Sequence, residues 1–453
     1  MRKIIWIVTL FLIISFNEVS GQGGKWTLED CINYAVTNNI DLQRQRLKTE
    51  ISETDLLKSR MDVLPDLNFG SYGRVGFGRS IDPVTNLITF KQNLTNSYTL
   101  SSNIDIFNGF TMLNTIAANK FMLKAGLEAE KIAKNTLIVD IMGQFYQVLY
   151  TKGLENASKM QLDLSEKQLF RIQKMVETGK EALSRQYEIE SQVSADKLAF
   201  TIAHNSSSQA ITILKQMLQL KPGTDFDILL PELKSTLITD SRYNTDSIYN
   251  IASQTLPRLK AIDYELKASK KQVAAARGGI APSLSLGGAV YTGYYKVISE
   301  ESTDQISFAT QLKNNNSQAV YLSLNIPIFN KYITGRNIKL AKIRKNDNEL
   351  RLELEKNILY TEIENACLDF NRGKDEFQAA GANFEFNKRS FNAVEKKFES
   401  GLVDVTDYSA AKTTLFKAET EELRTKLQLL IRKLTIRFYV TGEYEQVVSN
   451  STN

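Results

Sequence analysis

The sequence predicts a mainly helical chain with a few paired β-strands, built from one unit that occurs twice. Three observations carry this prediction: the scarcity and placement of proline, an internal repeat, and four short segments in which apolar and polar residues alternate. Of the 453 residues, 42% are hydrophobic and 24% are charged, which is the profile of an ordinary folded protein. We take each observation in turn.

Proline is rare and unevenly placed. The chain has seven prolines, where average usage would give about twenty. There is none in the 138 residues between Pro83 and Pro222, nor in the 126 residues after Pro327. Because proline breaks helix interiors, these two tracts permit long helices. The same scarcity excludes a disordered proline-rich chain, and two cysteines are too few for a disulfide scaffold.

The remaining composition argues against an enzyme and against a nucleic-acid-binding protein. The 56 basic and 51 acidic residues give a net charge of +5, too small and too dispersed to indicate nucleic acid. His204 is the one histidine in the sequence, and no Ser/His/Asp, CxxC, HExxH or P-loop arrangement occurs. We therefore expect no catalytic residue, no metal site and no cofactor. Cys31 and Cys367 are either a pair, which their spacing cannot show, or two small buried or semi-exposed thiols.

The first 21 residues have the pattern of a secretory signal peptide. Arg2 and Lys3 precede the apolar run Ile4–Phe16, and the small residue Gly21 precedes the expected cleavage point. The apolar run is too short for a confident transmembrane helix, and no later segment has eighteen consecutive apolar residues. The mature protein is thus expected outside the cytoplasm, either soluble or crossing a membrane as β-strands.

The chain contains an internal duplication. At an offset of 222 positions, LSSNIDIFN at 100–108 aligns with LSLNIPIFN at 322–330, with seven of nine residues identical. Without a gap, the same offset aligns Gly179 with Gly401. An offset of 217 aligns the beginnings of the two halves, so the difference is one of loop length. We expect a first repeat over 22–220, a connector over 221–246, a second repeat over 247–440 and a polar tail over 441–453.

Each repeat has the same order of elements. A helix opens it, over 27–64 and 245–280, and two strand-like segments follow. A long helical tract then runs from Asn108 to Gly179 and from Asn330 to Gly401, 71 positions in both cases, or about 105 Å of helix. Another helix follows each glycine. Heptad-like spacing of mostly apolar residues predicts that these helices pair, at Leu162, Ser165, Leu169, Ile172, Val176, Leu423, Leu427, Leu430 and Leu434. The expected result is a rod.

The four strand-like segments alternate between apolar and polar residues. They cover about 67–79, 96–107, 284–297 and 318–329, with polar loops between the members of each pair. Each is about ten residues long, the length of a transmembrane β-strand. The alternative is a soluble antiparallel sheet with one face on a core, although the flanking helices look too long to pack on so small a sheet. Four strands cannot close a barrel, so membrane strands would require two, three or four chains.

Three segments resemble known proteins. LSLNIPIFNKYITGRNIKLAKIR at 322–344 resembles the strand-to-helix signature of the outer membrane efflux proteins, the TolC family. WTLEDCINYAVTNNIDLQRQRL at 26–47 resembles the first helix of that family, and KFESGLVDVTDYSAAKTTL at 397–415 resembles its periplasmic hairpin tip. The resemblance covers essentially the whole mature chain.

This resemblance implies a fold and a function. The fold is mainly α with a transmembrane β-barrel: duplicated helix–hairpin–long helix–helix units form a trimeric α-barrel tube topped by a shared 12-stranded β-barrel. The function is the passive exit duct of a tripartite efflux or type I secretion system in the outer membrane of a Gram-negative bacterium. The implied partners are two further copies of the chain, outer-membrane lipid, a periplasmic adaptor (membrane fusion) protein and an inner-membrane RND, ABC or MFS transporter.

The resemblance also implies tip residues. In the family, a glycine followed six positions later by an aspartate helps to constrict the entrance; here these are Gly401 and Asp407. In the first repeat Gly179 is followed by Arg185 instead, so an all-acidic entrance is not expected. We expect Gly179, Arg185, Gly401, Asp404 and Asp407 at the tip, in adaptor contact and gating, with Arg185 and Asp407 forming a closing salt bridge.

Simpler interpretations stay open beside these. The glycines are also typical of helix C-caps, and Asp407 of a solvated acid in a first helical turn. At the level of the whole protein, the alternative is an exported coiled-coil adaptor or a structural protein without a channel. An adaptor should show one helical hairpin between β domains rather than two duplicated units. The cargo cannot be predicted from the sequence.

Overall fold

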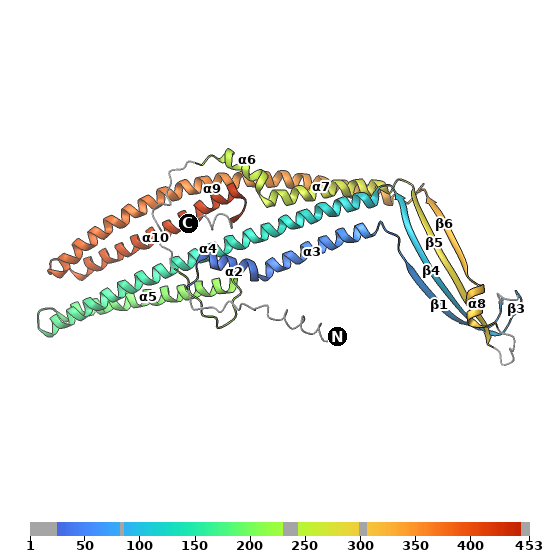
Figure 1. The fold of residues 1–453 in the computed structure, drawn as a ribbon. Helices are drawn as coiled ribbons and strands as arrows, with labels where there is room; N and C mark the ends of the chain where they lie inside the picture. Colours follow the sequence, from blue (N-terminus) through green and yellow to red (C-terminus); the bar gives the residue numbers. More distant parts are fainter. Residues whose placement is uncertain (1–24, 82–85, 230–242, 299–305, 445–453) are drawn as a thin grey trace, which may run out of the picture. The chain divides into compact units, whose positions relative to one another are not determined.

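The computed structural model describes residues 25–81, 86–229, 243–298 and 306–444 (Figure 1). The expected signal peptide therefore lies outside the described residues. Contacts divide the chain into two compact units. Unit 1 comprises Met1–Gln43, Ala133–Thr255 and Leu359–Asn453, and unit 2 comprises Arg44–Ile132 and Leu256–Ile358.

The expected order of elements is found in both repeats. The long helices α4 and α9 have 67 residues each, and their first and last residues are 222 positions apart. In the first repeat the elements are α2 (Leu28–Asn38), α3 (Ile40–Met61), β1 (Asn68–Gly76), β2 (Ser80–Ile81), β3 (Ile88–Thr89), β4 (Gln92–Asn108), α4 (Thr111–Glu177) and α5 (Leu183–Met217). In the second they are α6 (Thr245–Thr255), α7 (Pro257–Gly278), β5 (Ser283–Ile298), α8 (Phe308–Asn314), β6 (Ser317–Asn325), α9 (Ile333–Glu399) and α10 (Val405–Thr441).

The opening helix of each repeat is broken, where the sequence predicted one continuous helix. Asn39 separates α2 from α3 with φ −64° and ψ 125°, and Leu256 separates α6 from α7 with φ −64° and ψ 128°. These two residues are 217 positions apart, so the duplication has kept the break. Pro257 occupies the first position of α7, where a missing N–H costs nothing because that donor has no partner inside the helix.

The strands form one antiparallel sheet in unit 2, in the order β1-β4-β5-β6. β1 with β4 and β5 with β6 are the two expected hairpins, and β4 pairs with β5 over almost its whole length, which joins the repeats. The predicted boundaries were wrong by up to four residues. β4 begins at Gln92 rather than near 96, and β6 ends at Asn325, because Pro327 cannot donate to the ladder.

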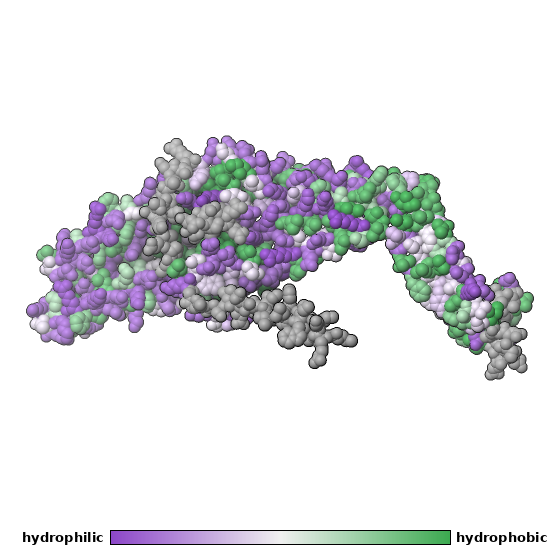
Figure 2. Space-filling view, viewed as in Figure 1, coloured by the Kyte–Doolittle hydropathy of each residue, from purple (hydrophilic) through white to green (hydrophobic). Residues whose placement is uncertain are grey.

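The two faces of the sheet differ as predicted. Directly paired residues share a face, and Phe69, Leu100 and Val290 form an apolar row across three strands. On the other face lie pairs such as Asp105 with Ser285. The apolar row is 40–70% exposed, and every residue of β6 is exposed. In Figure 2 apolar residues gather on the strands and at the helix ends next to them. The alternative of a sheet with one face packed on a core is therefore not what this chain has.

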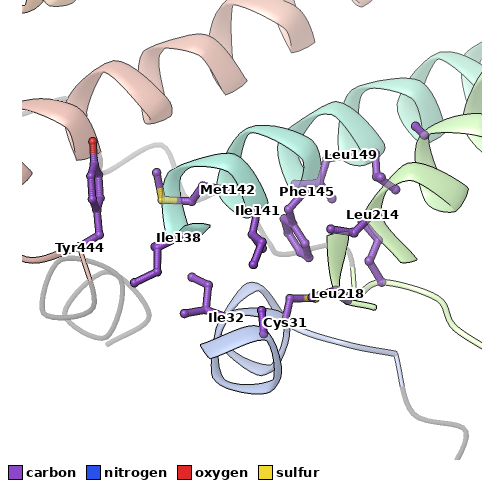
Figure 3. Close-up of a cluster of buried hydrophobic side chains, with 14 of the residues drawn as sticks. Cys31, Ile32, Ile138, Ile141, Met142, Phe145, Leu149, Leu214, Leu218 and Tyr444 are labelled. Atoms are coloured by element: carbon purple, nitrogen blue, oxygen red, sulfur yellow. The ribbon is translucent and has the colours of Figure 1, made fainter. Parts of the chain in front are cut away.

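Unit 1 contains a large apolar core (Figure 3). Side chains of α2, α4, α5 and α10 meet there, and Tyr444, just beyond α10, stacks on Phe438 with ring centroids 4.0 Å apart. Tyr444 falls in the segment expected as a polar tail, and residues 445–453 lie outside the described chain. Cys31 belongs to this core; both it and Cys367 are buried free thiols, and burial raises the pKa of Cys31 to about 12.

The described residues of the predicted connector are bound to the first described residues of the chain. Trp26 and Ile228 form a parallel β-bridge, and Trp26 N–H donates to the carbonyl of Asp227 at 2.8 Å. The Asp227 carboxylate also binds the ammonium group of Lys152 from α4. Within the described residues, no helix combines the length and apolarity needed to cross a membrane.

Candidate functional site

The two glycines predicted at a tip end the long helices in the same way. Gly179 has φ +69° and Gly401 has φ +75°, in the left-handed region that favours glycine. Gly179 N–H donates to Val176 and Lys180 N–H to Met175, at 2.9 and 2.8 Å. The equivalent bonds close the turn at Gly401. Both are Schellman caps, so the expected C-cap role is present, and each glycine connects a long helix to the next one.

The helices that follow begin differently in the two repeats. Asp404 is the N-cap of α10, and its carboxylate accepts a hydrogen bond of 2.8 Å from the backbone N–H of Asp407. Ala182, at the equivalent position 222 residues earlier, gives α5 no side-chain cap. Asp407 is exposed in the first turn of α10, where the helix dipole favours an acid.

Arg185 lies against the second repeat. Its guanidinium donates to the carbonyl of Val403 at 3.4 Å and lies 5.7 Å from the centre of the Phe398 ring. Its Nε is buried and makes no hydrogen bond within the described residues. Arg171 of α4 likewise reaches the carbonyl of Glu399, at 3.0 Å. The turn at Gly401 is thus held to the first repeat by two arginines.

The ion pairs of the described residues do not join Arg185 to Asp407 within the chain. Arg185 binds a backbone carbonyl and a ring of its own chain, whereas the Asp407 side chain is exposed. A salt bridge between these residues would need a second copy, and it stays a prediction.

An apolar cluster lies next to the two turns, between the ends of α4 and α9 and the beginnings of α5 and α10. Its buried members come from all four helices and include the stacked rings of Phe398 and Tyr408, with centroids 4.6 Å apart. The remaining buried members are Ile172, Ile189, Phe391 and Val405. Burial raises the pKa of the Tyr408 hydroxyl far above its ordinary value. The four helix ends therefore form one packed body within unit 1.

A buried charged cluster next to these rings was missed by the sequence analysis. The Lys412 side chain is 3% exposed, and its ammonium group donates to Asp196 Oδ2 at 2.6 Å and to the carbonyl of Gln161 at 3.1 Å. Ser165 binds both Lys412 and Asp196, and Gln192 donates to the other oxygen of Asp196 at 3.0 Å. Burial lowers the pKa of Lys412, while Asp196 favours its charged form.

A sequence signal for this cluster existed. Asp196 lies seven positions after the buried Ile189, and Lys412 seven after the buried Val405, so both stand in an apolar heptad seam. Ser165 was itself part of the predicted seam. What the sequence does not reveal is that the acid and the base face each other, because they are 216 positions apart.

A groove runs between α5 and α10 beside the tip. It is lined mainly by hydroxyl, carboxamide and carboxylate side chains, among them Ser184, Tyr187, Glu188, Ser191, Gln192, Thr406, Ser409, Thr413 and Thr414. Such a lining offers hydrogen bonds along two helices. In the part of the chain that the structure describes, no three His, Cys, Asp or Glu side chains are placed to hold a metal ion.

Residues 248–442 match the outer membrane efflux protein family, which confirms the resemblance read from the sequence. A comparison with curated protein sequences gives no match.

Solved structures match over almost the whole chain. The outer membrane channel CmeC of Campylobacter jejuni is 17% identical, with a TM-score of 0.77 over 94% of this chain and 88% of that one. The outer membrane protein VceC of Vibrio cholerae is 12% identical, with a TM-score of 0.76 over 92% and 96%. The open state of the MtrE channel of Neisseria gonorrhoeae is 18% identical, with 0.74 over 92% and 89%. At these identities the likeness establishes the fold.

Proposed function

We propose that this chain, whose second repeat matches the outer membrane efflux protein family, is the passive exit duct of an efflux system in the outer membrane of a Gram-negative bacterium. Three copies close one twelve-stranded β-barrel, and their helices continue it as a tube into the periplasm. Each copy contributes two hairpins, one from repeat 22–220 and one from repeat 247–440. The inner-membrane partner is an RND, ABC or MFS transporter, of an efflux or type I secretion system, which sets the cargo.

The observation that carries this proposal is the pair of open sheet edges. β1 and β6 are the edge strands, and each has nine residues. Because the sheet has four antiparallel strands, β6 of one copy runs antiparallel to β1 of the next when copies are placed in a ring. Open edges expose unpaired N–H and C=O groups, which hydrocarbon does not tolerate, so a membrane location requires closure by further copies.

The exposed apolar face supports a lipid environment. Phe69, Val320 and Leu322 are 70%, 81% and 63% exposed, and alternate positions on the same strands carry polar residues. A closed barrel would turn the apolar face to lipid and the polar face to a water-filled lumen. A soluble protein with this much exposed strand surface would aggregate.

We assign the tip to adaptor contact. Gly179, Gly401, Asp404 and Asp407 are exposed at the turns, and the polar groove between α5 and α10 lies next to them. Helical hairpins of a periplasmic adaptor would find hydrogen-bonding groups there on two parallel walls. Arg185, held against the second repeat, positions the turn at Gly401 for that contact.

The proposal is tested by reconstitution. The full-length protein, purified in detergent and inserted into a planar lipid bilayer, is expected to give discrete single-channel currents. Its oligomer is expected to migrate more slowly on a gel before heating than the single chain does after heating. Absence of currents in a preparation that is folded by circular dichroism would reject the duct and favour the adaptor or structural alternative.

A further inference from the structure

Two loops leave the end of the sheet where β1 and β5 finish; the sequence predicted them as polar loops, and each contains a short element. The loop from β1 to β4 contains the hairpin β2–β3, and the loop from β5 to β6 contains α8. Both loops leave the same end of the sheet, because β1 and β5 run in one direction, but they belong to opposite halves of it. In Figure 1 α8 and β3 lie at this end.

α8 occupies the place of a strand. β6 pairs with β5 only as far as Tyr291, so the same edge of β5 is left over from there to Ile298. Gln311 covers it as a neighbouring peptide would: its Oε1 accepts from Tyr295 N–H, and its Nε2 donates to the Tyr295 carbonyl, both at 2.9 Å. Asn315 Nδ2 donates to the carbonyl of Gly293 at 2.8 Å. The edge is closed to strand addition above β6.

The position of α8 is fixed by further contacts. Thr292 donates its hydroxyl to the carbonyl of Leu312 at 2.6 Å, and the Phe308 ring packs edge-on against Tyr294 with centroids 5.1 Å apart. Ser307 caps the helix through the N–H of Thr310. Ile306 and Phe308 nevertheless remain 41% and 46% exposed. α8 is thus a rigid ledge above the end of β6 with an uncovered apolar side.

The hairpin β2–β3 lacks such support. It has two paired positions, Ser80 with Thr89 and Ile81 with Ile88. Large apolar residues in or beside it are exposed, among them Phe77 at 74%, Ile81 at 64%, Ile88 at 51% and Phe90 at 75%. An isolated two-stranded hairpin is marginal in water and needs packing against a helix or another strand. Among the described residues these side chains are left largely uncovered, so the hairpin offers an apolar surface that a partner would stabilise.

We infer that this partner is α8 of the neighbouring copy, an inference that rests on the proposed trimer. When β6 pairs with β1 of the next copy, the ledge above β6 and the hairpin above β1 become neighbours across the seam. At each boundary between copies, the exposed apolar hairpin of one copy then packs against the exposed apolar side of α8 of the other. The copies are thus joined by this contact in addition to the pairing of β6 with β1.

Site-directed cross-linking tests the contact in the full-length, detergent-purified protein. Ile88→Cys is combined with Lys313→Cys in one variant, and Phe77→Cys with Asn314→Cys in another, so that one poorly placed pair does not decide the result. All four positions are exposed, and the native thiols are buried. On oxidation, at least one pair should give covalent dimers and trimers on a non-reducing denaturing gel. As the matched control, Ile88→Cys with Arg336→Cys at the opposite end of the sheet should stay monomeric.

Two failures are distinguishable. In the first, the native mass corresponds to three copies, but neither cysteine pair cross-links, or the pairs cross-link only within one chain and leave a monomer of altered mobility. The α8 contact is then wrong and the duct proposal stands. In the second, the native mass does not correspond to three copies. The proposed function is then wrong, and the α8 contact, which rests on it, is rejected with it.

Discussion

Lys412 of α10 and Asp196 of α5 form a buried ion pair between the two repeats, with 2.6 Å between Nζ and Oδ2. Two other groups complete the hydrogen bonding of Lys412, the carbonyl of Gln161 and the hydroxyl of Ser165. Taking both charges out of water is costly, and the geometry compensates only while both partners are present. The pair therefore selects how the helices of the two repeats align more than it adds stability.

Removing one partner should be far worse than removing both. Lys412→Met leaves a buried uncompensated carboxylate, and we expect a loss of about 3–5 kcal/mol, seen as a lower thermal midpoint by circular dichroism. The double variant with Asp196→Leu should recover most of that loss. Lys58→Met, which removes an exposed partner of Asp62, is the matched control and should change little. Equal midpoints for the single and double variants would contradict a buried pair.

Gly179 and Gly401 should be required because other residues are strained at positive φ, not because a larger side chain would clash. A Cβ at Gly179 or Gly401 would meet no atom within 4 Å, but φ is +69° and +75°. Substitution by alanine should cost about 1–2 kcal/mol at each position. Gly381→Ala, in the interior of α9 and equally free of clashes, should instead stabilise by about 0.5–1 kcal/mol. Thermal unfolding of the three variants checks the sign, and a stabilised Gly401→Ala would refute the Schellman turn.

The break between α2 and α3 should depend on Asn39. Its side chain is buried, and Oδ1 accepts from the N–H of Leu42 at 3.0 Å. Asn39→Ala should cost about 1 kcal/mol, the usual loss for an N-cap. Leu256, at the equivalent break, makes no side-chain cap, and there Pro257 pre-sets the backbone; Pro257→Ala should cost about 0.4–1 kcal/mol through the unfolded chain. Denaturant unfolding measures the free energy of unfolding of both variants. An Asn39→Ala variant as stable as the unsubstituted protein would show that this cap does not stabilise the fold.

Acid should loosen the connector through Asp227. Burial by itself raises the pKa of this carboxyl, but the hydrogen bond from Lys152, with further help from Ile228 N–H and Lys25, lowers it below its ordinary value of 3.8. Because the folded pKa is the lower one, the stabilisation is present above about pH 4 and is lost as the pH falls through the folded pKa. Asp227→Asn should therefore flatten the fall of the thermal midpoint below about pH 4. An identical pH profile would contradict the assignment.

Charge at the tip should act on conduction rather than on folding. Asp407 is exposed, and its backbone N–H, not its carboxylate, takes part in the cap. Asp407→Lys should therefore lower the thermal midpoint only slightly, through the loss of a favourable interaction with the helix dipole. It should alter single-channel conductance if Arg185 and Asp407 gate the entrance across copies. Conductance that is unchanged by charge reversal at Asp407 alone or at Arg185 alone would remove the pair from the gate.

The order of the helices and strands could be predicted where the sequence repeats itself. The ends of α4 and α9 follow from proline-free tracts and two glycines at one offset, and the four strands follow from alternation. The break at Asn39 was missed because a single extended residue leaves no pattern, although Pro257 at the equivalent place marked it. α8 was missed because Gln311 is ordered by an unpaired strand edge, which exists only after the sheet has formed. The partnership of Lys412 with Asp196 depends on helix packing and has no local signature.

The most direct measurement of the central claim is the mass of the protein in detergent solution, by light scattering corrected for bound detergent. The account predicts a monodisperse assembly of three chains that is lost when the protein is heated. A monodisperse monomer that stays in solution without detergent would contradict it, because the open edges of β1 and β6 and the apolar face of the sheet would then have no partner.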